Sequence, residues 1–152
     1  MMKDQPSHLK PIFGLIALSL LFVTVFLFGC SNSERASPPV ERPSPPGEYA
    51  DLENPLDANK SNREAGKEIY QTHCVSCHGE GGKGDGSAAS SMDPKPSDLT
   101  SVVDSLSDAY LFWRVSEGGG MEPFNSGMKP WKSVLSEEER WQVILFIKTL
   151  GR

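Results

Sequence analysis

The stretch Cys74-Val75-Ser76-Cys77-His78 decides how the rest of the chain is interpreted. Two cysteines three positions apart on one helical turn place both thiols on the same side, within reach of two vinyl groups at one edge of a porphyrin. The histidine that follows is placed to bring an imidazole nitrogen to the iron. The motif therefore predicts one covalently attached haem c, with Cys74 and Cys77 as the attachment points and His78 as an iron ligand.

Three other interpretations of this motif are weaker. A thioredoxin-like redox pair requires a βαβ context, and the flanking sequence has no such pattern. A structural zinc site requires further ligands, but after the N-terminal apolar segment the only histidines are His73 and His78. A plain disulfide explains neither the adjacent histidine nor the long loops that follow it.

The second iron ligand is sought among the soft donors, which are Met92, Met121 and Met128. Met128 is favoured because it lies on a turn shortly before the last helix, where a strap held at both ends can cross the far face of the haem. Met121, which follows three glycines, stays open as the alternative, and Met92 is expected to be an apolar plug under a loop. His73 precedes the first cysteine of the motif, so we expect it to be exposed on the attachment side.

On both sides of the motif, capping residues and apolar periodicity predict three helices. They are expected at about 62–72, from Ser105 or Ser107 to about 116, and from Ser136 to 150, the first and last opened by capping boxes (Ser61 with Glu64, and Ser136 with Glu139). The segment 79–101 is rich in Gly, Ser, Pro and Asp and has no strand pattern. The fold class expected is all-α, a small shell of helices and long loops around one haem.

Composition excludes several other classes. The 152 residues carry a net charge of −5 without any basic block, so no nucleic-acid partner is expected. Three cysteines are too few for a disulfide-stapled scaffold. Short helices with long loops form a marginal core at this size, which favours a large central ligand.

The N-terminus has the pattern of an export signal. Lys3 and Lys10 precede an uncharged run that ends in Leu27-Phe28-Gly29-Cys30, which resembles a bacterial lipobox with Cys30 as the lipidated residue. An uncleaved membrane anchor is the alternative. We expect a signal or anchor over 1–29, a Pro/Ser-rich tether over 30–47 and a haem domain over 48–152, facing the periplasm or cell exterior.

From about residue 48 onward the chain resembles the class I c-type cytochromes, in particular small bacterial members with one haem. Gly66 and Tyr70, eight and four residues before Cys74, match the family's glycine and aromatic residue in the first helix. The resemblance implies that Gly66 lets the last helix cross closely, near Val143 and Phe146. It also implies a glycine-rich loop over 79–86 and a distal ligand loop.

The resemblance implies a one-electron carrier rather than an enzyme, with redox proteins as partners and the membrane reached through the N-terminal segment. Two alternatives stay open, a fixed haem subunit of a larger complex and a haem enzyme or sensor with a displaceable sixth ligand. Members of the family often carry a proline just after the glycine-rich loop, whose backbone oxygen orients the iron-binding histidine. Here Ser87 stands in that place, so the acceptor for His78 is left open.

Overall fold

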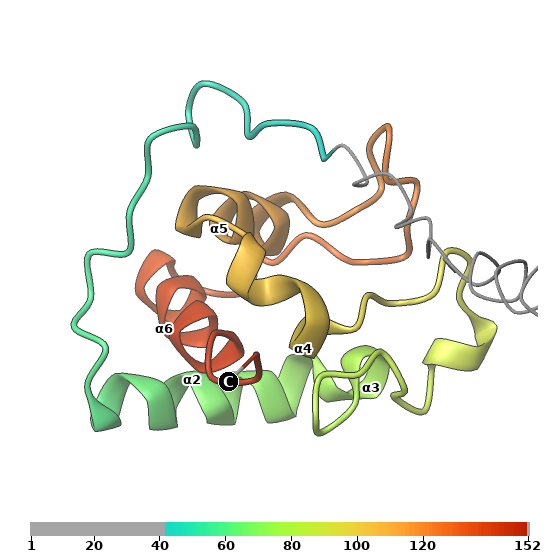
Figure 1. The fold of residues 1–152 in the computed structure, drawn as a ribbon, viewed down its shortest axis with the longest axis horizontal. Coiled ribbons are helices and arrows are strands. Elements are labelled where there is room, and N and C mark those ends of the chain that lie inside the picture. Colours follow the sequence, from blue (N-terminus) through green and yellow to red (C-terminus); the bar gives the residue numbers. More distant parts are fainter. Residues whose placement is uncertain (1–41, 152) are drawn as a thin grey trace, which may run out of the picture. The chain divides into compact units, whose positions relative to one another are not determined.

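A computed structural model describes residues 42–151, which form helices and loops without any strand (Figure 1). The helices are α2 (Lys60–His73), α3 (Val75–His78), α4 (Leu99–Val102), α5 (Asp108–Glu117) and α6 (Glu137–Ile147), with 3-10 turns at η1 (Ala89–Ser91) and η2 (Val103–Ser105). The all-α expectation is confirmed. Cys30 and the predicted signal or anchor segment lie outside the described residues. Within the described part, none of the helices has the length and apolarity needed to cross a bilayer.

The α2 and α6 helices cross in direct backbone contact at Gly66 (Figure 1). A β-carbon placed on Gly66 would lie 2.6 Å from the carbonyl carbon of Gln142 and 3.1 Å from the nitrogen of Val143, so only glycine fits. One turn further on, the rings of Tyr70 and Phe146 pack with their centroids 5.1 Å apart. The close crossing implied by the sequence is therefore present, with Gln142 and Val143 as the residues at the contact point.

The start of α2 differs from the predicted capping box. Asn59 is the N-cap, and its side-chain oxygen accepts a hydrogen bond from the Asn62 nitrogen at 2.9 Å. Ser61 lies inside the first turn, and Glu64 faces Lys60 at 3.5 Å instead of reaching back. The prediction of Ser61 as the cap was wrong because asparagine caps as well as serine and stands two residues earlier.

The other two predicted helices begin where the sequence places them. Ser107 caps α5, and Ser136 forms a complete capping box with Glu139 at the start of α6. Gly118, with φ of 72°, ends α5 in a conformation that favours glycine. The α6 helix ends at Ile147, three residues earlier than expected, and a tighter turn continues the chain to Leu150.

The core packs α5 and α6 together with Tyr70 of α2 and with the segment 48–59 that leads into α2, which we call the lead-in. Phe112 of α5 stacks on Trp141 of α6, with centroids 3.9 Å apart and planes inclined by 15°. Tyr49 of the lead-in is buried, and its hydroxyl donates to the Glu117 carboxylate at 2.5 Å. The side chain of Asn54 donates to the Trp141 carbonyl at 3.1 Å. The lead-in is therefore part of the folded domain.

Candidate functional site

The cysteine–histidine motif lies at the junction of α2 and α3. Helix α2 ends at His73, where the Cys74 nitrogen donates to the Tyr70 carbonyl at 2.9 Å. The chain then forms the single turn of α3, in which the nitrogens of Cys77 and His78 both donate to the Cys74 carbonyl, at 3.1 and 2.8 Å. The structure thus brings the two thiols and the imidazole together on one turn, as the spacing predicts.

The glycine-rich loop after the motif closes the end of α3. Its nitrogens at Gly84, Gly86 and Ala88 donate to three successive carbonyls of the motif, those of His78, Cys77 and Ser76, at 2.9, 3.2 and 2.8 Å. Three of the glycines have positive φ, those at positions 79, 82 and 84. The loop therefore supplies the donors that the carbonyl end of a one-turn helix needs.

The imidazole of His78 is oriented by a backbone carbonyl. Its Nδ1 lies 3.4 Å from the carbonyl oxygen of Ser97. Because a carbonyl only accepts, this contact places the proton on Nδ1 and leaves the lone pair of Nε2 available to a metal. Burial lowers the pKa of His78 and the Ser97 carbonyl raises it, with burial the larger effect. The structure thus answers the question left open by Ser87, because the acceptor for His78 is the carbonyl of Ser97.

Both cysteines of the motif are half-buried and not joined in a disulfide, and Cys74 packs against the core. Burial, with a smaller contribution from Cys77, raises the pKa of the Cys74 thiol to about 12. Unattached, this sulfur stays protonated at neutral pH. A thioether carries no titratable proton and is well suited to an apolar wall, so the environment of Cys74 fits a covalently substituted sulfur.

Met128 lies on a strap, residues 128–135, that is tied to the end of α5. The Gly119 nitrogen donates to the Met128 carbonyl at 2.8 Å, and the Trp131 nitrogen donates to the Val115 and Ser116 carbonyls, both at 3.1 Å. The half-buried side chain of Met128 packs against the core. A strap held in this way gives Met128 a fixed position, as the sequence interpretation requires.

Two side-chain contacts join the strap region to the half of the domain that carries the motif. The rings of His73 and Trp131 lie with centroids 5.0 Å apart and planes inclined by 56°. Beside Gly127, the methyl group of Met92 lies 2.8 Å from where a β-carbon would stand. His73 is half-buried, so the prediction that it would be exposed was wrong, because the strap folds back over the end of α2.

Met121, the alternative donor, lies in a different environment. The Arg114 guanidinium donates to its sulfur at 3.6 Å and also lies 3.5 Å above the ring of Phe124. The loop 119–128 therefore folds over Arg114, and the thioether of Met121 already has a cationic partner. This contact weakens the case for Met121 as an iron ligand.

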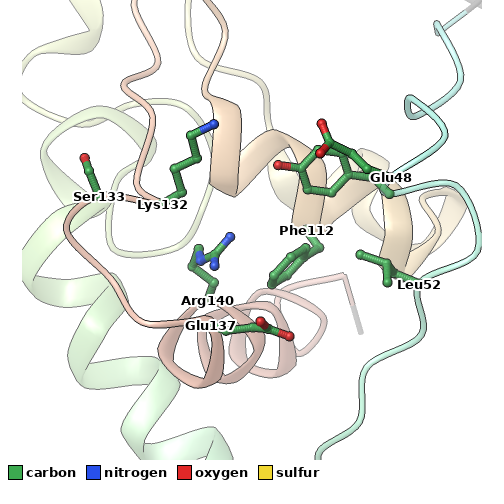
Figure 2. A pocket seen from close by; sticks show the side chains of 8 residues that line it. Glu48, Leu52, Phe112, Lys132, Ser133, Glu137 and Arg140 are labelled. Atoms are coloured by element: carbon green, nitrogen blue, oxygen red, sulfur yellow. The ribbon is translucent and has the colours of Figure 1, made fainter.

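A hollow of about 640 Å³ opens elsewhere on the domain (Figure 2). Phe112 forms part of its wall, with the Arg140 guanidinium 4.6 Å above that ring. Side chains of the lead-in, the strap and the start of α6 complete the lining, namely Glu48, Tyr49, Leu52, Lys132, Ser133 and Glu137. None of the predicted site residues lines this hollow, so it is not the haem site.

The donor set fits haem c on chemical grounds. It comprises two free thiols on one turn, an imidazole with its Nε2 lone pair free, and a half-buried thioether on a fixed strap. Within residues 42–151 no group of three or more His, Cys, Asp or Glu side chains is arranged to hold a metal ion. The candidate iron ligands named above are single donor side chains, the imidazole of His78 and the thioether of Met128.

Comparison with known families agrees with this donor set. The family model described as "Cytochrome C oxidase, cbb3-type, subunit III" matches residues 61–147, more than half of the chain. The chain therefore belongs to this family of cytochrome c domains, a group of class I c-type cytochromes. Such a domain implies haem c and electron transfer. None of the curated proteins compared with the chain matches it.

Among solved structures, a chain of the reducing HAO-like protein complex of Kuenenia stuttgartiensis is similar in fold. The identity is 26% and the TM-score 0.55 over 74% of the present chain. The match covers 53% of that chain, so the present chain spans about half of its neighbour's length. The similarity covers the cytochrome c fold and leaves the remainder of the neighbour without a counterpart.

Proposed function

We propose that the protein is a one-electron carrier whose single, covalently bound haem c would be held by His78 and Met128 as iron ligands. The observation that supports this proposal is an imidazole oriented by a backbone carbonyl, together with a thioether on a strap hydrogen-bonded to α5. Haem c supplies an Fe(III)/Fe(II) couple when it is bound. The residues that hold the haem orient it and set its reduction potential.

Those residues favour electron transfer over binding of a substrate. His78 is oriented through Nδ1 by the Ser97 carbonyl, which fixes the ring and increases the basicity of Nε2. Met128 supplies a thioether, which stabilises the reduced state and raises the reduction potential. If His78 and Met128 both bind the iron, no position would be left for a substrate, so we propose that the protein is not itself an enzyme.

The spectrum of the oxidised protein tests the ligand assignment. Wild type and Met121→Ala should both show the weak far-red absorption of a thioether bound to ferric haem, and Met128→Ala should lack it. The Met128→Ala variant should also have a lower reduction potential and bind CO rapidly in the ferrous state. Loss of the band in Met121→Ala instead, or rapid CO binding by the ferrous wild type, would refute the assignment.

We also propose that the domain is tethered to a membrane through lipidated Cys30 and faces the periplasm or cell exterior. The proposal is supported by the lysines before the apolar run and by the Leu27-Phe28-Gly29-Cys30 sequence. Labelling with a fatty acid should mark the wild type and not Cys30→Ala. A protein that stays unlabelled but membrane-bound, with residues 1–29 retained, would indicate an uncleaved anchor.

A second candidate function is that of a haem subunit within a larger assembly. It is favoured by the similarity to a chain of the reducing HAO-like complex. Of the three tryptophans, Trp113 and Trp141 are buried in the domain, and Trp131 is half-exposed. If this function is right, the full-length protein should co-purify with stoichiometric partners after mild solubilisation, and Trp131→Ala should weaken that association.

A further inference from the structure

We infer that His73 is a positioning residue that holds the strap carrying Met128 against the helix carrying the cysteine motif. The inference rests on the proposed His78/Met128 ligation and adds a residue that the motif itself does not include. Neither the attachment chemistry nor the ligation requires an aromatic residue at position 73. Its role follows from what its side chain contacts.

His73 stands at a rigid point of the domain. It is the last residue of α2, whose backbone is fixed by the crossing with α6 at Gly66. The next residue is Cys74, so His73 cannot move far without moving the first attachment point. Its imidazole is half-buried and lies against the ring of Trp131, with centroids 5.0 Å apart.

Trp131 transmits this contact to the ligand. It lies three residues after Met128, and its nitrogen donates to the carbonyls of Val115 and Ser116 at the end of α5. The strap is therefore held by α5 through its backbone and by α2 through the His73 ring. Opening the strap to release Met128 requires Trp131 to leave the imidazole.

The His73 side chain faces two groups in the described residues, the ring of Trp131 and the carboxylate of Glu139. Glu139 is close enough for the charge of His73 to lower its pKa, but hydrogen bonds with Ser136 are the larger cause. The Glu139 carboxylate accepts from the Ser136 nitrogen at 2.7 Å, so it is engaged within the capping box.

The contact between Met92 and Gly127 lies on the other side of Met128 along the chain. It involves a flexible thioether and a residue without a side chain, so it resists displacement less than two packed rings do. The two contacts flank the ligand, and the ring pair is the stiffer of the two. Of these two side-chain contacts, we therefore assign the larger part in holding the strap against α2 to the pair of His73 and Trp131.

Holoprotein variants test the inference through the rate at which the ferrous protein binds CO, which depends on release of the sixth ligand. His73→Ala should bind CO about 2- to 12-fold faster than wild type, the change in open population expected for loss of one aromatic pair. His73→Phe, which keeps a ring, should stay within about twofold of wild type. Gln71→Ala, an exposed change on the same helix, is the matched control and should leave the rate unchanged.

The outcomes separate this inference from the ligand assignment. If wild type shows the thioether–ferric band while His73→Ala and wild type bind CO equally fast, the positioning role is refuted and the ligation stands. Equal acceleration by His73→Phe and His73→Ala would also refute it, because a ring would then have no effect. Absence of the band in wild type would overturn both. If His73→Ala does not mature, His73→Gln, which keeps bulk without a ring, replaces it with the same expected acceleration.

Discussion

Replacing Gly66 with alanine should destabilise the protein, although the same substitution usually stabilises a helix. In an unobstructed helix, alanine is more favourable than glycine by about 1 kcal/mol. At Gly66 the new methyl group would lie 2.6 Å from the Gln142 carbonyl carbon and closer still to the Gln142 oxygen. Both atoms belong to the α6 backbone, so no side chain can rotate away and the two helices have to separate.

The cost follows from this separation. Carbon atoms in contact are normally about 3.5–4.0 Å apart, so the helices must move by about 1 Å where they cross. Overpacking of this kind costs about 1–3 kcal/mol, and loosening the packing of Tyr70 on Phe146 adds about 0.5–1.5 kcal/mol. Because the intrinsic gain of alanine offsets part of the loss, we expect Gly66→Ala to lower the unfolding free energy by about 2 kcal/mol.

Thermal unfolding of the holoprotein, followed by far-ultraviolet circular dichroism, measures this effect. A loss of this size should lower Tm by about 10 °C. Lys67→Ala, an exposed change at the next position, should shift the unfolding free energy by less than about 0.5 kcal/mol. A Gly66→Ala protein as stable as wild type, or more stable, would show that the helices do not cross at Gly66.

Three further predictions concern a cap, a carboxylate and a backbone acceptor. Asn59→Ala should cost about 1 kcal/mol in thermal unfolding and Ser61→Ala almost nothing, and the reverse order would restore Ser61 as the cap. Hydrogen bonds from Lys132 and Tyr49 lower the pKa of Glu117 below its ordinary 4.5. Glu117→Gln should therefore be less stable than wild type above about pH 4.5, with the gap closing as pH falls through the lowered pKa; a gap that persists in acid would contradict this. Ser97→Ala should leave the reduction potential unchanged because the main-chain oxygen orients His78, and a clear shift would implicate the hydroxyl.

The sequence predicted the parts of the fold whose signals are local. The motif placed both cysteines and the histidine on one turn, and Ser107 and Ser136 marked the starts of α5 and α6. The crossing at Gly66 followed from the family resemblance. The short helix α4 was missed, although Asp98 caps it by accepting from the Thr100 nitrogen at 2.9 Å, because one turn has too little periodicity to be recognised.

Apart from the crossing at Gly66, contacts between segments distant along the chain could not be predicted from the sequence. The Ser97 carbonyl reaches His78 only because the loop folds back over α3. Every residue type has a main-chain oxygen, so the sequence does not indicate which one accepts from His78. The contact of His73 with Trp131 joins the end of α2 to the strap, two segments far apart in the sequence, so neither residue alone indicated it. The haem domain was expected to begin at residue 48, and the hydrogen bond from Tyr49 to Glu117 is a specific contact at this start that the sequence did not indicate.

The proposed function requires a haem that is covalently joined to the protein through Cys74 and Cys77. The intact mass of the denatured, matured protein tests this directly. A covalently attached haem stays on the chain after denaturation, whereas a noncovalently bound haem is lost. We expect the mass of the chain plus one haem, and loss of that addition when both cysteines are replaced by alanine. A matured wild-type protein that is colourless and has the mass of the bare chain would contradict the account.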